Sequence, residues 1–127
     1  MDEKWYQEEL LEYYRLPKNK RVLPSTDFSS QEYNPSCGDS VCMMGIIANN
    51  TITEIAFQGS GCVISQATAS MLTEHCLNKS IDEVLQMSEK SITSLIGLTL
   101  GPVRIKCALL PLLVLQHGIT CYRERIL

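Results

Sequence analysis

Three cysteines and one aspartate lie where the chain changes from loop to helix or strand, and their residue types can bind metal or carry sulfur. They are Cys37, Asp39, Cys62 and Cys107. Thiolates and carboxylates are ligands of zinc, and a thiolate is also the nucleophilic form of cysteine. Four such groups from three distant segments match the ligand number of a tetrahedral metal site.

Cys37 and Asp39 flank one glycine, directly before an apolar stretch. In an extended chain, side chains two residues apart point the same way, so the soft thiolate and the hard carboxylate can bind one metal ion. The carboxylate would then be the more easily displaced ligand. The alternative is a turn that contains a buried cysteine and an aspartate that caps the turn.

Cys62 and Cys107 are each expected to lie directly before a helix. Free N–H groups and the positive end of the helix dipole stabilise a thiolate at that place. Lys106 adds a positive charge beside Cys107. Cys107 is therefore the best candidate for a nucleophile and is the predicted catalytic residue. The alternative is that both cysteines are small buried residues at the start of ordinary helices.

The other cysteines and the two histidines have surroundings that fit a metal site less well. Cys42 falls inside an apolar strand, Cys76 ends a helix, and Cys121 lies in a charged tail. His75 and His117 fall near the ends of predicted helices, where a histidine more often interacts with the helix dipole than with a metal ion. The lack of a CxxC pair argues against zinc-ribbon and thioredoxin-like sites.

Apolar residues recur at helical and strand intervals, which indicates a single α+β domain over residues 1–127. Helices are predicted at residues 5–15, from Cys62 to 77–78, and at residues 91–98. A short helix is predicted after a capping box at Ser80, and a last helix from Cys107 to 117–118 with Gly118 as its C-cap. Strands are predicted at 40–48 and 51–58 around an Asn49-Asn50 turn, with an edge strand near 31–33 inside a loop over 18–36.

The composition is that of an ordinary globular protein with a real core. The chain has 127 residues, of which 45% are apolar and 20% charged, and its net charge is −3. This charge and the lack of a basic run argue against nucleic-acid binding. The longest apolar run, 108–115, is too short to cross a membrane, and the acidic start does not resemble a targeting segment. We therefore expect a cytoplasmic protein with reduced cysteines.

Taken in order, these motifs resemble the iron–sulfur cluster scaffold family of IscU, SufU and the N-terminal domain of NifU. The resemblance rests on residues 37–39, 59–65 and 102–107, with a further similarity at residues 13–19. It extends from about residue 5 to residue 117. It implies a small α+β domain with a three-stranded antiparallel sheet packed against helices. It also implies a [2Fe–2S] cluster or zinc as the cofactor, held by Cys37, Asp39, Cys62 and Cys107.

The resemblance implies two functions that share this site. In the first, the protein is a scaffold that accepts sulfur at Cys107 from a cysteine desulfurase, builds a transient [2Fe–2S] cluster and passes it to apo-proteins. Asp39 is then the labile ligand that allows release. In the second, a SufU-type protein binds zinc and relays persulfide sulfur. Both describe a scaffold or sulfur acceptor rather than a conventional enzyme.

Two departures from the family pattern leave both functions open. Lys106 stands where IscU-type members have a histidine, and it is similar to the lysine of SufU-type members. Asp39 is therefore expected as the fourth ligand, and Lys106 could instead attract the persulfide anion. The insertion that SufU-type members carry before the last cysteine is absent. Gly101 and Arg104 replace a proline and a lysine of the segment that a specialised chaperone recognises in IscU-type members, so chaperone binding does not follow.

A third hypothesis is a purely structural zinc domain. It predicts that losing a single cysteine ligand unfolds the protein. The size of the apolar core argues against it, because a chain of 127 residues does not need a metal ion to fold.

Overall fold

The order of helices and strands follows the sequence prediction, with changes at the ends of the elements. A computed structural model describes residues 3–35 and 38–127. Its elements are α1 (Glu3–Arg15), β1 (Phe28–Asn34), β2 (Asp39–Ala48), β3 (Thr51–Ser60), α2 (Val63–Cys76), α3 (Ile81–Leu85), α4 (Glu89–Ile96) and α5 (Pro102–Ile126). The strands form an antiparallel sheet in the order β1-β2-β3. The expected α+β fold with a three-stranded antiparallel sheet is confirmed.

The hairpin between β2 and β3 turns on two asparagines. Asn49 and Asn50 have φ angles of 53° and 63°, and a two-residue type I′ turn needs positive φ at both positions. The two strands pair along most of their length, with one register shift between Ile46 and Ile47, and Ser60 at the end of β3 lies opposite Ser40. The start of α2 is thereby returned to the beginning of β2, where Asp39 lies.

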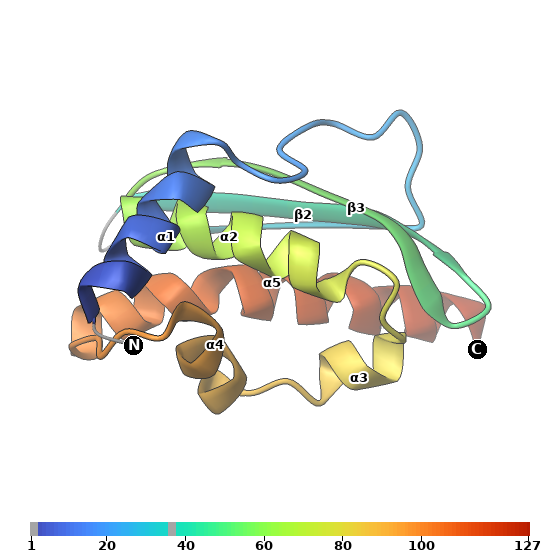
Figure 1. Cartoon of the computed structure of the whole chain (residues 1–127). Helices are drawn as coiled ribbons and strands as arrows, with labels where there is room; N and C mark the ends of the chain where they lie inside the picture. The colour runs from blue at the N-terminus through green and yellow to red at the C-terminus, as the bar shows by residue number, and fades with distance from the viewer. Residues whose placement is uncertain (1–2, 36–37) are drawn as a thin grey trace.

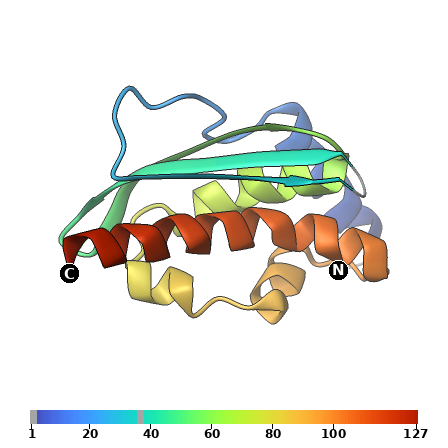
Figure 2. The same cartoon turned by 180° about the vertical axis from the view of Figure 1, so that it is seen from behind.

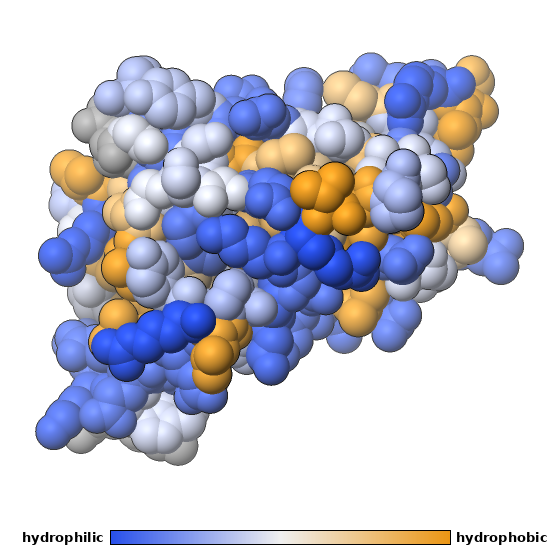
Figure 3. All heavy atoms as spheres, turned by 90° about the horizontal axis from the view of Figure 1, so that it is seen from above, coloured by the Kyte–Doolittle hydropathy of each residue, from blue (hydrophilic) through white to orange (hydrophobic). Residues whose placement is uncertain are grey.

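The helices and the segment 16–27 lie on opposite faces of the sheet (Figures 1 and 2). α2 and α5 pack on one face with α1 beside α2, and α3 and α4 lie beyond this layer (Figure 1). The main core fills the space between sheet and helices. On the other face, Leu23 from the segment 16–27 packs on Met44 and Ala56. Figure 3 views this outer face, where hydrophilic side chains surround smaller apolar patches.

The start and end of α5 differ from the sequence prediction. A helix from Cys107 to 117–118 was expected, but α5 begins at Pro102 and continues to Ile126, so this part of the prediction is wrong. Pro102 suits the first turn, because the N–H that proline lacks has no helical partner there. Pro111 lies inside the helix rather than in its first turn, and it cannot donate a hydrogen bond to the carbonyl of Cys107.

Gly118 is not a C-cap but a contact point inside α5. A Cβ at Gly118 would lie 3.1 Å from the ring of Phe28 and 3.2 Å from Cβ of Ser30. Glycine therefore lets α5 approach β1 closely, and the buried side chains of Phe28 and Ser30 also explain why β1 is longer than the predicted strand at 31–33.

Among the described helices, α5 alone is long and apolar enough to cross a membrane, judged by length and composition only. In the folded chain, 44% of its most apolar window is buried. α5 contacts α2, β1 and β2, and its buried residues include Leu112, Leu115 and Ile119. We therefore interpret α5 as the core helix of this fold.

The shorter helices agree more closely with the prediction. Ser80 caps α3, and its hydroxyl accepts a hydrogen bond from the N–H of Glu83 at 3.1 Å, as the capping-box motif predicts. α4 begins and ends two residues earlier than the predicted 91–98, because Gly97 terminates it with a φ of 75°.

Candidate metal centre

Asp39 is the first residue of β2 and is fully buried, with 0% of its surface exposed. A buried carboxylate needs hydrogen bonds or a cation to offset the loss of water. Its Oδ1 accepts a hydrogen bond from the N–H of Cys62 at 2.7 Å, and its Oδ2 lies 3.4 Å from Sγ of Cys62. The pairing of β2 with β3 therefore brings two predicted ligands, Asp39 and Cys62, into contact.

Gly61 permits this contact between Asp39 and the start of α2. Its φ of 135° is a conformation that residues with side chains rarely adopt. A Cβ at Gly61 would lie 2.3 Å from Oδ1 of Asp39. The glycine before Cys62 thus determines how closely the backbone can pass the carboxylate.

Cys62 is the N-cap residue of α2, as the sequence predicts. Its Sγ accepts a hydrogen bond from the N–H of Ser65 at 3.4 Å, and N–H groups at a helix start favour negative charge on an acceptor. The Cys62 thiol in turn donates to Oδ2 of Asp39. A metal ion bound by both groups would replace this shared proton.

Cys107 lies on α5 and is buried, with 4% of its surface exposed. Its predicted place directly before a helix is wrong, because α5 begins at Pro102 and Cys107 falls in the second turn. The helix-dipole argument for a Cys107 thiolate therefore weakens, since that effect falls off within the first turn. The chemical interest of Cys107 comes instead from the groups that the fold places beside it.

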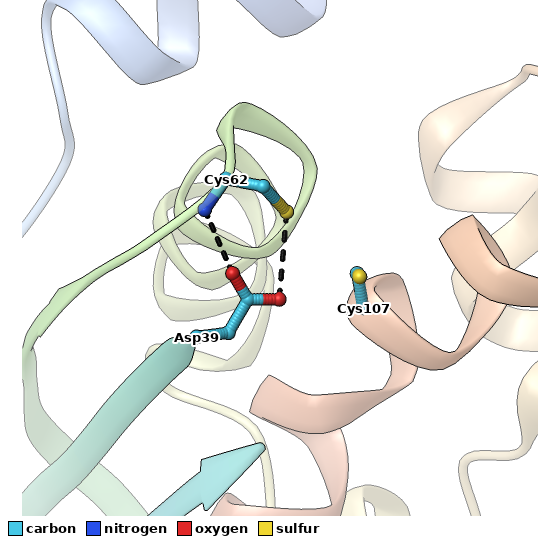
Figure 4. Close-up of side chains that lie close together, drawn as sticks. All are labelled: Asp39, Cys62 and Cys107. Atoms are coloured by element: carbon cyan, nitrogen blue, oxygen red, sulfur yellow. Dashed lines mark hydrogen bonds between the residues drawn. The ribbon is translucent and has the colours of Figure 1, made fainter. Parts of the chain in front are cut away.

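One ligand atom from each of Asp39, Cys62 and Cys107 lies within 4.8 Å of the other two. Figure 4 shows the Asp39 carboxylate hydrogen-bonded to Cys62, with Cys107 to one side of both, and the three side chains coming from β2, the start of α2, and α5. A tetrahedral ion with bonds of about 2.0–2.3 Å holds its ligand atoms roughly 3.3–3.8 Å apart, so small side-chain rotations would complete these three bonds. Two thiols and a carboxylate fit zinc or the iron of a cluster.

Cys37, the remaining predicted ligand, lies outside the described residues, so its role as a ligand stays a prediction. Neither His75 nor His117 belongs to the ligand group in the part of the chain that the structure describes.

The other described cysteines lie away from this group. Cys42 is half-buried and packs with the small cluster on the outer face of the sheet. Cys76 is in the main core, and burial raises the pKa of its thiol to about 12. Cys121 is exposed, with its Sγ 3.6 Å from Nε2 of His117 one helical turn away. The sequence prediction missed this pair because it ended the helix before Cys121.

An apolar cleft of about 550 Å³ opens beside the two cysteine ligands. α1, the segment 98–101 and the starts of α2 and α5 form its walls. Its lining includes Cys62, Cys107, Leu10, Leu100, Val103 and Arg104. The cleft gives a partner or substrate a route to both sulfurs.

Lys106 does not line this cleft. It lines a second groove of about 480 Å³ on another side of α5, together with Tyr33, Leu113 and His117. The cation that shares the cleft with Cys107 is Arg104, which the sequence prediction did not assign to the site. A helix predicted from Pro102 would have indicated it, because residues three apart share a helix face.

Comparisons with known proteins agree with this fold. The family described as NifU-like N terminal domain matches residues 5–127. The zinc-dependent sulfurtransferase SufU of Bacillus subtilis is 30% identical over 131 residues, which cover 90% of this chain and 88% of that protein. The iron–sulfur cluster assembly protein IscU of Plasmodium falciparum is 32% identical over 125 residues, which cover 96% of this chain and 76% of that protein.

A solved structure supports the fold. The N-terminal part of a nitrogen-fixing NifU-like protein from Brucella abortus superposes with a TM-score of 0.76 at 17% identity, covering 94% of each chain. The match to the family over residues 5–127 agrees with the resemblance that the cysteine and aspartate motifs indicated. From the matched length and these two relatives, we conclude that the chain belongs to the NifU-like N-terminal domain family.

Proposed function

We propose that this protein is a sulfur-accepting scaffold for iron–sulfur cluster assembly. The observation that carries the proposal is the meeting of Asp39, Cys62 and Cys107 at one end of the domain, within 4.8 Å of one another. Cys37 supplies the fourth ligand in this proposal. The partners are a cysteine desulfurase, which gives sulfur, and apo-proteins in the cytoplasm, which take the finished [2Fe–2S] cluster.

Asp39 makes the ligand set suitable for a cargo that must leave again. A carboxylate is a harder and weaker ligand for iron in a cluster than a thiolate is. Its Oδ1 already accepts the Cys62 N–H at 2.7 Å, so the carboxylate is not left without a partner when the cluster departs. Three thiolates and this carboxylate therefore hold a cluster less firmly than four thiolates would.

Cys107 is the proposed sulfur acceptor. Its thiolate attacks the terminal sulfur of the desulfurase persulfide, forming a new S–S bond at Cys107 Sγ while the S–S bond of the donor breaks. The bonding electron pair leaves with the donor cysteine, which becomes a thiolate. One sulfur atom moves without any net oxidation or reduction, so this step needs no added reductant.

A zinc-bound sulfur relay is the second candidate. It is favoured by Lys106 in place of a histidine ligand and by the 30% identity to a protein named a zinc-dependent sulfurtransferase. When bound, zinc would keep the thiol ligands deprotonated. Asp39, Cys62 and Cys107 would hold it together with Cys37, and the same Cys107 would accept sulfur.

Reconstitution under nitrogen separates the two candidates. The protein is incubated with ferrous iron, cysteine, a cysteine desulfurase and a thiol reductant, which reduces persulfide sulfur to sulfide. Its visible absorption is followed before transfer to an apo-ferredoxin. A scaffold gains [2Fe–2S] absorption and then activates the ferredoxin. A relay instead retains one zinc per chain and stimulates the desulfurase without forming a cluster. Cys121→Ser, at an exposed cysteine outside the site, is the matched control and should behave as wild type in both assays.

A further inference from the structure

Two cations lie close to Cys107 in sequence, but α5 places them on different sides. Arg104 precedes Cys107 by three residues, so both share one helix face and both line the apolar cleft. Lys106 shares its face with Leu110, Leu113 and His117, which line the other groove. Proximity in sequence therefore favours Lys106 as the partner of a sulfur anion, whereas the tertiary structure favours Arg104.

Two charged residues line the cleft, Glu3 and Arg104. The carboxylate of Glu3 accepts a hydrogen bond from the N–H of Thr99 at 3.4 Å. Arg104 is exposed and forms no salt bridge within residues 3–35 and 38–127. Its guanidinium group remains charged at every physiological pH and carries several N–H donors. The cleft thus contains one cation without a salt bridge, in the same lining as two cysteines and one hydrogen-bonded carboxylate.

The remaining lining suits a soft sulfur anion on a short peptide segment. Leucine, valine and isoleucine residues are seven of the 13 residues that line the cleft, and apolar walls keep water away from a reactive persulfide. A volume of about 550 Å³ falls in the range of small-molecule sites, so the cleft admits a few side chains and not a folded domain.

We propose that this cleft receives the persulfide-bearing segment of the sulfur donor, and that Arg104 positions the persulfide anion at Cys107. The inference rests on the proposed function, and it adds the route of entry and the cation that guides the sulfur. Charge complementarity selects the occupant, because an apolar cleft that contains an arginine and ends at thiol groups matches an anionic sulfur carried on an apolar loop.

Arg104 forms and breaks no bond in the transfer. The Cys107 thiolate and the incoming persulfide are both anions, so they repel each other as the new S–S bond forms and the donor thiolate leaves. A guanidinium group beside them offsets that repulsion in an environment of lower dielectric than water. Arg104 is therefore a positioning residue.

The first test compares Arg104→Ala with Lys106→Ala in single-turnover transfer of ³⁵S from a cysteine desulfurase. We expect Arg104→Ala to slow the transfer about tenfold and to flatten its salt dependence, because charge steering is screened by salt. Arg104→Lys should restore part of the rate and the salt dependence. Lys106→Ala should stay within twofold of wild type. Equal rates for the two alanine variants would overturn the assignment of Arg104.

The second test places a carboxylate in each of the two grooves. Val103 and Leu113 are both exposed on α5, with 70% and 57% of their surfaces accessible, and they line the cleft and the other groove respectively. Val103→Asp should slow sulfur transfer and weaken desulfurase binding about tenfold, whereas Leu113→Asp should leave both within twofold. The opposite order would move the docking site to the other groove. Circular dichroism checks that each variant is folded.

Cys107→Ser distinguishes failure of this inference from failure of the proposed function. If Cys107→Ser still accepts ³⁵S at the wild-type rate, the proposed function is wrong. If Cys107→Ser is inactive while Arg104→Ala and Val103→Asp transfer sulfur like wild type, only the inference about the cleft fails. If Arg104→Ala has normal zinc content and is slow with both the desulfurase and a small-molecule persulfide, Arg104 acts on the persulfide anion as proposed; normal transfer from the small-molecule persulfide would overturn that role.

Discussion

Cys76 and Cys107 are buried cysteines on packed helices, but their sulfurs have different neighbours. Cys76 has 0% and Cys107 4% of its surface exposed, and the helices that carry them, α2 and α5, contact each other. Sγ of Cys76 lies 3.9 Å from Sδ of Met87 within the core. Cys107 instead lies with Asp39 and Cys62 and lines the cleft.

This difference shows that the exposed fraction of a cysteine does not distinguish a core residue from a candidate ligand. Burial raises the pKa of the Cys76 thiol to about 12, with Lys79 opposing part of the shift, so Cys76 stays a neutral packing group. Cys107 has nearly the same exposure, but the fold brings a carboxylate and a second thiol to it. The polar neighbours and the route from solvent are what distinguish the two sites.

The largest expected effect comes from exchanging each of these cysteines for alanine. Cys107→Ala should lower sulfur acceptance from a desulfurase at least a hundredfold, because the attacking sulfur is gone. Cys76→Ala should keep the rate within twofold and lower the free energy of unfolding by about 1 kcal/mol through lost packing. Transfer of ³⁵S and urea unfolding measure the two quantities. A Cys76 variant as inactive as the Cys107 variant would remove the distinction.

A second substitution tests whether the Asp39 carboxylate allows the proposed site to release its cluster. Asp39→Cys should slow cluster transfer to an apo-ferredoxin about tenfold, because a fourth thiolate holds iron more firmly than a carboxylate. Cys42→Ser, on the outer face of the sheet, is the control and should transfer at the wild-type rate. Faster transfer from Asp39→Cys would contradict the labile-ligand role.

A third substitution disturbs the cysteine site through its backbone. Gly61→Ala should lower zinc affinity about tenfold, because the new Cβ would lie 2.3 Å from Oδ1 of Asp39 and displace that ligand. Gly38→Ala is the matched control, since Gly38 also has a positive φ but has no atom within 4 Å of an added Cβ. A competition titration with a zinc chelator measures both affinities. Equal losses would show that backbone strain alone is responsible.

The smallest effect is the pH dependence of stability at Cys76. Its thiol pKa rises from 9.0 unfolded to about 12 folded, so folding favours the protonated form. The resulting stability is complete below pH 9 and is lost as pH rises toward 12, at most by about 1.4 kcal/mol per pH unit. Cys76→Ala should reduce the fall in stability between pH 9 and 10, as measured by urea unfolding. An unchanged slope would mean that the thiol is not desolvated.

Above pH 10 a second group contributes in the same direction. A hydrogen bond to Glu74 raises the pKa of Tyr13 from 10.0 to about 12. The Cys76 comparison is therefore confined to the interval below pH 10, where most of the Tyr13 hydroxyl is still protonated in the unfolded chain. Tyr13 is present in both wild type and Cys76→Ala, so the difference between their slopes reports the thiol.

Much of the fold follows from local chemistry that can be read in the sequence. The paired asparagines at 49–50 adopt the left-handed conformations that a tight hairpin needs, and Ser80 caps its helix as the motif predicts. Cys62 is likewise an N-cap because glycine and cysteine precede an uninterrupted helical pattern. The prediction was wrong at both ends of α5. It started the helix at Cys107, but Pro102 begins it, and it treated Gly118 as the C-cap, but Gly118 packs α5 against β1.

The sequence by itself determined the order of the elements, the candidate ligands Cys37, Asp39, Cys62 and Cys107, and the family resemblance, because these depend on residue type and near-neighbour spacing. Only the tertiary structure decided which side chains share a site. Asp39 meets Cys62 through the register of the sheet, and Arg104 rather than Lys106 shares the cleft with Cys107. The physical reason is that a helix separates adjacent residues onto different faces, while packing brings distant ones together.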